Sequence, residues 1–300
     1  MDHAAFTLGP PVIGASNPGT SRVSPGGVAL NVARDLARLG RRVRLVTRVG
    51  ADSDGEAIVA AAEADGIDAS RISVSTTART ATYRASFDDA GGLIIGIADM
   101  AVMDEVTVAG ASGAVAEAAE EETHVIDANL PAGTLAFLVD AAARRGRPVA
   151  AVSVSPAKAV RLAPLLGRLT LLFATRREAA AMLGRDDDPA LPTLSLATLL
   201  AARGVAHVIV TNSGDPLAAA TAGEAHLFAP FPAAVRSVNG AGDALAAGTL
   251  HGLAEGRSFF DAVLAGLAAA AITVEEDDTV AAGLAPAEVE ARIAKARIVA

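Results

Sequence analysis

The sequence predicts an α/β fold in which helices cover both faces of a largely parallel sheet. Short apolar strands alternate with helices along most of the chain, as expected for βαβ units. Hydrophobic residues make up 52% of the 300 positions, which is enough for a large buried core. Only residues 71–98 break the alternation, because they contain no plausible helix. No low-complexity linker divides the chain, so we expect a single domain over residues 1–300.

The individual elements follow from hydrophobic periodicity. Near the N-terminus, F-T-L-G-P-P-V-I is a doubtful first strand because two prolines interrupt it. Strands are expected at 43–49, 124–126, 148–154, 169–173 and 205–211. Helices are expected at 56–64, 135–143, 177–183, 196–202, 244–254 and 259–274.

The region 71–98 predicts a β-hairpin. Residues 80–87 alternate between apolar and polar side chains, and D-D-A-G-G then L-I-I-G-I follow as a turn and a second strand. Together with residues 11–25, this hairpin is expected to form a small β-sheet lid over a ligand site. The apolar face is expected to carry Ala81, Tyr83, Ala85 and Phe87, and the wet face Thr80, Thr82, Arg84 and Ser86.

Composition excludes several classes of function. The net charge of −9 disfavours nucleic acid or an anionic membrane as a partner. The chain has no cysteine, so thiolate metal sites and cysteine nucleophiles are absent. The longest apolar run, residues 262–274, is too short for a bilayer, which requires about 20 residues. No signal peptide opens the sequence, so we expect a cytoplasmic protein.

The stretch S-V-N-G-A-G-D-A-L, residues 237–245, places one acid at the start of a predicted helix. Gly240 and Gly242 allow a sharp turn and close approach to a ligand, and the free N–H groups of a helix start favour an anion. Phosphate is the obvious anion, yet neither a P-loop lysine nor a third dinucleotide-binding glycine is present. One hypothesis makes Asp243 a base that takes a proton from an attacking hydroxyl. On this turn alone, helix capping by Asp243 comes first.

A second glycine motif lies near the N-terminus. In P-G-G-V-A-L-N-V-A-R-D-L-A-R-L-G, residues 25–40, Gly26 and Gly27 precede an amphipathic helix that Gly40 closes. Asn31 lies one turn into this helix, off its apolar stripe, where an amide can contact sugar hydroxyls. In isolation, a solvated helix asparagine explains it as well. Lys158 is expected to face solvent.

The two glycine motifs together resemble the signatures of the ribokinase-like, or PfkB, carbohydrate kinases. The resemblance covers nearly the whole chain and is most specific in G-A-G-D-A-L-A-A-G. Within the family, S-N-P-G, I-A-D-M, D-A-N-L and V-S-P-A-K-A look most like pseudouridine kinases. The resemblance implies a Rossmann-like αβα sandwich with a β-sheet lid. It also implies transfer of phosphate from ATP to a hydroxyl of a sugar or nucleoside, with pseudouridine 5′-phosphorylation as the specific reaction.

The resemblance also implies roles for individual residues. Asp243 matches the catalytic base, and Gly240, Ala241 and Gly242 match the anion hole. ATP and Mg²⁺ are the implied cofactors, with a monovalent cation as a third ion, and lids of the family often pair into homodimers. Substrate contacts are implied for Gly26, Gly27, Asn31 and Asn129, nucleotide contacts for Thr211, Ser213, Gly214 and Asn239, and magnesium organisation for Glu178.

Several positions depart from the family pattern. Family members begin with a strand that ends in a sugar-binding acid, but no Asp or Glu occurs between His3 and Arg34. The departures near the nucleotide and metal positions are Thr175 for an amide, Val152 for an aspartate, Ser213 and Pro216 for glycines, and Ser237 and Asn239 for Asp and Thr. Two alternatives therefore stay open, a homologue that binds ligand without efficient turnover and a non-enzymatic protein that dimerises through its lid.

Overall fold

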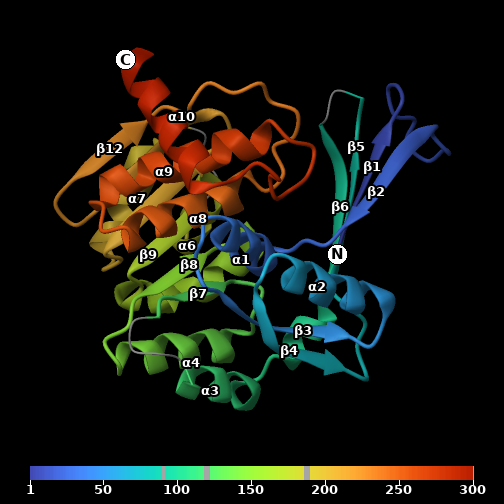
Figure 1. The fold of residues 1–300 in the computed structure, drawn as a ribbon, viewed down its shortest axis with the longest axis horizontal. Coiled ribbons are helices and arrows are strands. Elements are labelled where there is room, and N and C mark those ends of the chain that lie inside the picture. The colour runs from blue at the N-terminus through green and yellow to red at the C-terminus, as the bar shows by residue number, and fades with distance from the viewer. Residues whose placement is uncertain (90–91, 118–121, 186–189, 300) are drawn as a thin grey trace.

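The computed structural model describes residues 1–89, 92–117, 122–185 and 190–299. It is a mixed α/β molecule whose helices lie on both sides of a central sheet, while a smaller sheet stands away from the body (Figure 1). The predicted α/β class is confirmed. No helix in the described part of the chain is both long and apolar enough to span a bilayer.

The main sheet has six strands in the order β12-β11-β10-β9-β8-β7. The pairs β7–β8, β8–β9 and β9–β10 are parallel, and β11 and β12 add an antiparallel edge. These strands are β7 (His124–Asp127), β8 (Val149–Val152), β9 (Leu171–Thr175), β10 (His207–Asn212), β11 (Asp215–Ala220) and β12 (Ala225–Phe228).

Helices bury both faces of this sheet because side chains alternate along each strand. In β9, Leu172 belongs to one hydrophobic core and Leu171 and Phe173 to the other. The first core is covered by α4 (Ala132–Ala143), α5 (Pro156–Ala159), η2 (Val160–Arg168), α6 (Arg176–Met182) and α7 (Thr193–Ala202). The second is covered by α1 (Val28–Arg38), α8 (Ala241–Ala254), α9 (Phe259–Val274) and α10 (Pro286–Val299).

A two-stranded parallel sheet lies beside the main one. It consists of β3 (Arg44–Gly50) and β4 (Asp68–Ser75), connected by α2 (Ser53–Ala64). Among the described residues neither strand pairs with β7, but α1 contacts both β3 and β7. The small core under α2 includes Leu45, Val49 and Ile58. Residues 71–75, which we expected in the lid, therefore pair within this body as part of β4.

The sheet that stands away from the body has four strands in the order β2-β1-β5-β6 (Figure 1). Our doubt about the first strand was wrong, because β1 ends at Thr7 before the two prolines begin. The strand pairs with β2 in antiparallel and with β5 in parallel orientation. The members are β1 (Asp2–Thr7), β2 (Gly19–Ser24), β5 (Thr82–Phe87) and β6 (Leu93–Asp99), and η1 (Ala101–Glu105) and α3 (Val108–Glu117) follow.

The two faces of this sheet differ from the expected pattern. On the predicted apolar face, Ala85 is buried and Phe6 stacks on Phe87 with ring centroids 5.1 Å apart. The opposite face is not uniformly wet, because it also presents Val23, Ile95 and Ile97, each more than half exposed. The expected faces covered only residues 80–87. In the hairpin register Ile95 and Ile97 lie opposite Ser86 and Arg84, and β2 supplies Val23 to the same face.

Helix α1 packs against α8 and buries an acid between them. Asp35 is fully buried, and neither carboxylate oxygen has a partner among the described residues. Burial, reinforced by the charge of Asp243, raises the pKa of Asp35 to about 8, while Arg38 and Arg34 oppose the shift. The Asp35 carboxyl group is therefore neutral in the folded protein near pH 7.

The variant Asp35→Asn should be more stable than the wild type at alkaline pH. The folded state holds the Asp35 proton up to its pKa of about 8, whereas the unfolded state releases it near its ordinary pKa of about 3.9. Between these values the folded state binds more protons, so the free energy of unfolding falls as pH rises. Asparagine removes this dependence, and thermal unfolding at about pH 5.5, 7 and 8.5 should show a melting-temperature gain of a few degrees that grows with pH.

The exposed Asp104 supplies the matched control Asp104→Asn, which should follow the wild-type curve. Parallel curves for Asp35→Asn and the wild type would show that Asp35 is ionised in the folded protein.

Candidate functional site

The first turn of α8 is built on a glycine that no other residue can replace without strain. Gly240 is the N-cap and has a left-handed backbone with φ of 80°. A β-carbon on Gly240 would lie only 1.9 Å from the backbone oxygen of Thr279. The glycine therefore serves both the turn and the close approach of the 279 loop.

Two backbone amides at this helix start have no acceptor within the described residues. The N–H of Ala241 donates weakly to the Val238 carbonyl at 3.4 Å, but the N–H groups of Gly242 and Asp243 donate to no group in the described part of the chain. The space above Gly242 is open, because a β-carbon there would meet nothing within 4 Å. Free amides at the positive end of a 14-residue helix form a site for an anion.

Asp243 lies in this turn and is held by the other glycine motif. The Asn31 Nδ2 donates to Asp243 Oδ2 at 2.8 Å. Burial is the main cause that raises the pKa of Asp243 to about 7, the charges of Asp2 and Asp127 add to it, and the Asn31 hydrogen bond opposes it. The N-cap of α8 is Gly240 rather than Asp243, and the Asp243 side chain accepts from Asn31 on another helix, so capping does not explain its position. A carboxylate with this pKa exchanges protons near neutral pH, as a general base requires.

A cavity opens between the start of α1, β3 and the loop after β7. Gly26, Gly27 and Asp2 lie along one side, and Asp127 and Asn129 along another. A β-carbon on Gly26 would lie 1.9 Å from Asp2 Oδ2, so this glycine is needed for the carboxylate to fit. Gly27 has φ of 114°, which also requires glycine.

Asp2 corrects the sequence analysis. The sugar-binding acid expected at the end of the first strand is absent between His3 and Arg34, but Asp2 directly precedes that interval. The carboxylate of Asp2 lies beside Gly26 in the cavity and acts electrostatically on Asp243. The Gly26-Gly27 motif was the signal that could have located Asp2, because a glycine allows another side chain to pack directly against its backbone.

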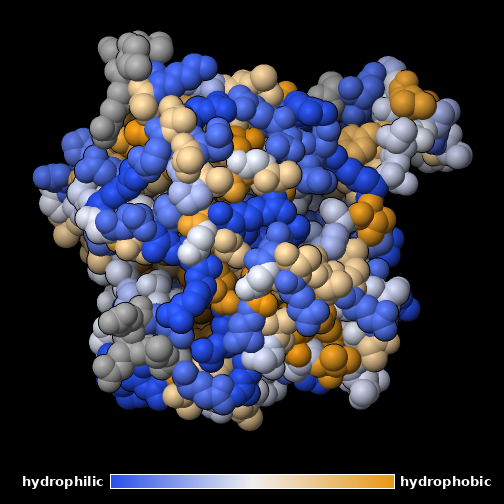
Figure 2. Space-filling view, viewed as in Figure 1, coloured by the Kyte–Doolittle hydropathy of each residue, from blue (hydrophilic) through white to orange (hydrophobic). Residues whose placement is uncertain are grey.

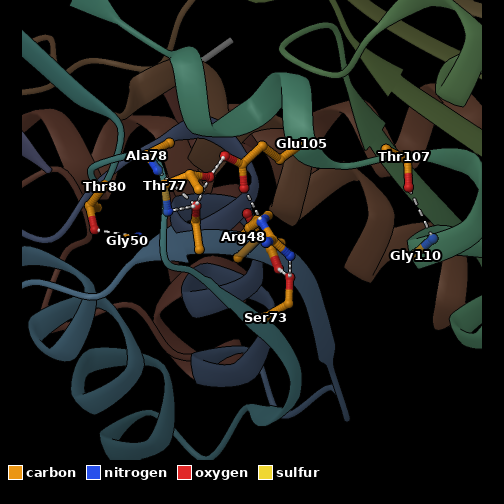
Figure 3. Close-up of polar contacts among 11 residues, drawn as sticks. Arg48, Gly50, Ser73, Thr77, Ala78, Thr80, Glu105, Thr107 and Gly110 are labelled. Carbon is orange, nitrogen blue, oxygen red and sulfur yellow. Dashed lines mark hydrogen bonds and ion pairs between the residues drawn. The ribbon is translucent and has the colours of Figure 1, made fainter.

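Polar contacts fix the cavity wall formed by Met103 of η1 and by Met100, which directly precedes this helix. Arg48 Nε donates to Glu105 Oε2 at 2.7 Å, and Thr77 Oγ1 donates to Glu105 Oε1 at 2.8 Å (Figure 3). Thr80 Oγ1 accepts from the Gly50 N–H at 2.9 Å in the same view. These bonds tie the segments that enter and leave the β5–β6 hairpin to β3.

Glu178 lies at the start of α6 and is already bonded to protein groups. Its Oε2 accepts from the Thr175 N–H at 2.7 Å and from Ser153 Oγ at 2.6 Å, while Thr175 caps the helix in return. The departure from an amide to Thr175 therefore creates a capping box. Within the described residues no group of three acids or histidines is placed to hold a metal ion.

The remaining predicted nucleotide residues divide between two places. Asn239 directly precedes Gly240, and its N–H donates to Ser237 Oγ at 3.3 Å. Thr211, Ser213 and Gly214 lie instead in the β10–β11 hairpin and do not line the cavity. Ser213 has φ of 51°, in the left-handed region where glycine was expected.

Comparison with known proteins decides the family. The profile described as "pfkB family carbohydrate kinase" matches residues 1–285. The chain belongs to the PfkB family. This PfkB chain is therefore a sugar or nucleoside kinase.

Individual relatives agree with this assignment. A carbohydrate kinase structure from Agrobacterium tumefaciens is 33% identical, with a TM-score of 0.81 over 98% of this chain and 94% of that one. Pseudouridine kinase of Escherichia coli is 28% identical over 83% of this PfkB chain and 79% of its own length. A putative ribokinase II of E. coli, solved with ATP and Mg²⁺, shares the fold, with 17% identity and a TM-score of 0.81 over 98% and 96% of the two chains.

Replacing Asn31 with leucine should raise the pKa of Asp243 above 7. Leucine has a similar size but cannot donate, so the hydrogen bond that favours the charged carboxylate is lost. A carbon-13 NMR titration of the aspartate carboxyl groups measures the shift, with Asp243→Asn to assign the resonance. Asn17, in the β1–β2 loop, provides the control Asn17→Leu, which should leave this pKa unchanged. An unchanged pKa in Asn31→Leu would mean that the bond is not formed in solution.

Proposed function

We propose that this PfkB-family kinase moves the γ-phosphate of ATP to the 5′-hydroxyl of a nucleoside, with pseudouridine as the preferred acceptor. One observation carries the proposal. A carboxylate with a pKa of about 7, Asp243, is fixed by Asn31 directly beside two unoccupied backbone amides. The base and the anion site thus lie within one helical turn.

In the proposed reaction, Asp243 takes the proton from the acceptor hydroxyl as its oxygen forms a bond to the γ-phosphorus. The bond from that phosphorus to the β,γ-bridging oxygen breaks, and ADP leaves. The amides of Gly242 and Asp243 and the dipole of α8 stabilise the negative charge on the transferring phosphoryl group. Asp2 and Asp127, with Asn129, accept or donate hydrogen bonds to the ribose hydroxyls from the cavity.

The site suits a magnesium ion that binds together with the phosphates of ATP. Mg²⁺ usually keeps several waters and binds through substrate phosphates and one or two carboxylates. The described residues hold no preformed cage of acids, and Glu178 is the carboxylate proposed to hold the hydrated ion. When bound, Mg²⁺ would neutralise charge on the phosphates.

Pseudouridine is proposed as the acceptor on two grounds. The E. coli relative of that name matches 83% of this chain, and of the residues that resemble its branch, Met100, Asp127 and Asn129 line the cavity. A direct assay supplies Mg·ATP with pseudouridine, uridine, adenosine or ribose, in potassium and in sodium buffer, and detects the phosphorylated product by mass spectrometry. Product with none of these acceptors would favour the ligand-binding homologue. The engagement of Glu178 by Thr175 and Ser153 is the observation that favours that alternative.

The variant Asp243→Asn should lose the phosphotransferase activity but keep nucleotide binding. Loss of a general base lowers kcat by about 10²- to 10⁴-fold, whereas the backbone amides that would bind phosphate are retained. In the wild type, kcat/KM should fall as pH drops below about 7, because protonated Asp243 cannot accept a proton. Steady-state ADP release and a thermal shift with Mg·ATP measure the two properties.

Asp104→Asn serves again as the control and should behave as the wild type. Activity of Asp243→Asn within tenfold of the wild type would exclude Asp243 as the base.

We also propose that the four-stranded sheet mediates a homodimer. Hydrophobic residues are visible at the outer end of this sheet in Figure 2, and its exposed face carries Val23, Ile95 and Ile97. Replacing Ile95 and Ile97 together with glutamate should convert the dimer to monomer in sedimentation velocity, because two charges would be buried in the interface. A wild-type protein that sediments as a monomer at all concentrations would contradict this proposal.

A further inference from the structure

Asp35 is a buried acid that the proposed reaction does not use. Its side chain is fully buried on α1, and neither carboxyl oxygen has a hydrogen-bond donor within the described residues. The two arginines on the same helix bond to another acid, because Arg34 Nε and Arg38 Nε donate to Asp65 at 2.5 and 3.3 Å. A buried carboxyl group without a partner is unfavourable, so the position of Asp35 requires an explanation.

Asn31 carries a complementary unsatisfied atom. Only 4% of this residue is exposed, and its Nδ2 donates to Asp243 Oδ2 at 2.8 Å. The Asn31 Oδ1 is buried as well, and no donor among the described residues reaches it. An amide oxygen can only accept, so it requires a donor. An acceptor without a donor thus lies directly beside the contact that fixes the proposed base.

Helix geometry brings Asp35 and Asn31 together. The two residues are four positions apart on α1, so they are neighbours on one face of the helix. Helical side chains tilt toward the N-terminus, which places the Asp35 carboxyl group over the turn that carries Asn31. The charge of Asp243 acts on Asp35, as expected when both α1 residues approach the same turn of α8. The Asn31 Oδ1 therefore lies within reach of the Asp35 carboxyl group.

The protonation state of Asp35 supplies the missing donor. The carboxyl group is neutral in the folded protein near pH 7, because burial raises its pKa to about 8. A neutral carboxyl group has one O–H donor, whereas the Asp243 carboxylate can only accept. The three side chains then form a chain in which Asp35 donates to Asn31 and Asn31 donates to Asp243. The reversed amide would place the Asn31 oxygen against the Asp243 carboxylate, which is unfavourable.

We infer that Asp35 is a positioning residue for the base: it donates to Asn31 Oδ1 and so holds the Asn31 NH₂ group toward Asp243. Asp35 does not line the cavity, so it acts through Asn31 rather than on a ligand. When Asp35 loses its proton, it becomes a second acceptor and competes with Asp243 for the same NH₂ group. The inference rests on the proposed role of Asp243 as the base, and it adds an alkaline limit to the reaction.

The first test is the pH dependence of kcat/KM with Mg·ATP and pseudouridine. The charged groups that act on Asp35 are Asp243 on α8, Arg38 and Arg34 on α1, and Asp65 at the end of α2. Activity of the wild type should rise as Asp243 ionises near pH 7 and fall as Asp35 ionises near pH 8. The variant Asp35→Asn keeps a donor but cannot ionise, so the alkaline fall should disappear. The same fall in Asp35→Asn, with unchanged circular dichroism across the pH range, overturns the inference.

The second test compares Asp35→Asn with Asp35→Leu, which has the same branching but no donor. Neither side chain carries a charge, so the difference between the two variants isolates the hydrogen bond to Asn31. We expect Asp35→Asn to keep kcat within about threefold of the wild type near neutral pH, and Asp35→Leu to lower it about 10-fold with little change in KM. Equal kcat values in the two variants overturn the inference. If leucine prevents folding, Asp35→Ala takes its place in this comparison and the next.

A measurement without turnover separates this inference from the kinase proposal. Carbon-13 NMR titration gives the pKa of Asp243 in both variants in the absence of substrate. The pKa should be higher in Asp35→Leu than in Asp35→Asn, because the Asn31 amide is then free to turn its oxygen toward the carboxylate. This difference, found alongside a wild type that phosphorylates no acceptor, supports the role of Asp35 and overturns only the kinase proposal. Equal pKa values in the two variants, alongside an active wild type, overturn the inference while the kinase proposal stands.

Discussion

The hydrogen bond between Asn31 and Asp243 is the contact on which the site depends. It joins residues 212 positions apart, on the first turns of α1 and α8. Each helix starts from a glycine with a positive φ, Gly27 and Gly240, so both backbones come close to the same space. Because one amide fixes the carboxylate beside free N–H groups, the base and the anion site keep a constant separation.

The burial that makes Asp243 reactive has a wider electrostatic cost. The charges of Asp2 and Asp127 raise the pKa of Asp243, and the charge of Asp243 in turn raises that of Asp35, which lies buried one turn beyond Asn31 on α1. The N-terminal ammonium acts on Asp2, Lys158 acts on Asp127, and Arg34 and Arg38 act on Asp35, and each lowers the pKa of its carboxyl group against the effect of burial. Concentrated negative potential is unfavourable in the empty protein, and it is relieved when groups that donate hydrogen bonds bind there.

Periodicity was sufficient to predict the αβα core, because β7 to β10 and the helices between them are continuous in sequence and strongly apolar. The glycine turns likewise led to Asp243 and Asn31. The misses have two physical causes. The position of Asp2 and the Lys158–Asn129 contact depend on which distant segments lie together in space, whereas the face of Ile95 and Ile97 depends on the register of the hairpin.

The departures from the family pattern are absorbed locally. Thr175 replaces an amide yet caps α6 and positions Glu178, and Ser213 adopts the left-handed backbone expected of glycine. Ser213 has the left-handed backbone that glycine favours, and Thr175 begins α6 as its N-cap. Their consequence for nucleotide binding therefore lies in side-chain chemistry rather than in the path of the chain.

The separation of β3 and β4 from the main sheet gives the molecule two parts of unequal strength. The main sheet is sealed by two large cores, whereas β3, β4 and α2 share one small cluster and contact the rest of the molecule through α1 and η1. A weakly held cooperative unit opens at lower free energy than the whole chain unfolds. Asp2 directly follows Met1, which belongs to the small cluster, and Asp243 lies on α8 in the stronger part, so partial opening on warming would pull the acceptor pocket apart while the helix bearing the base stayed folded.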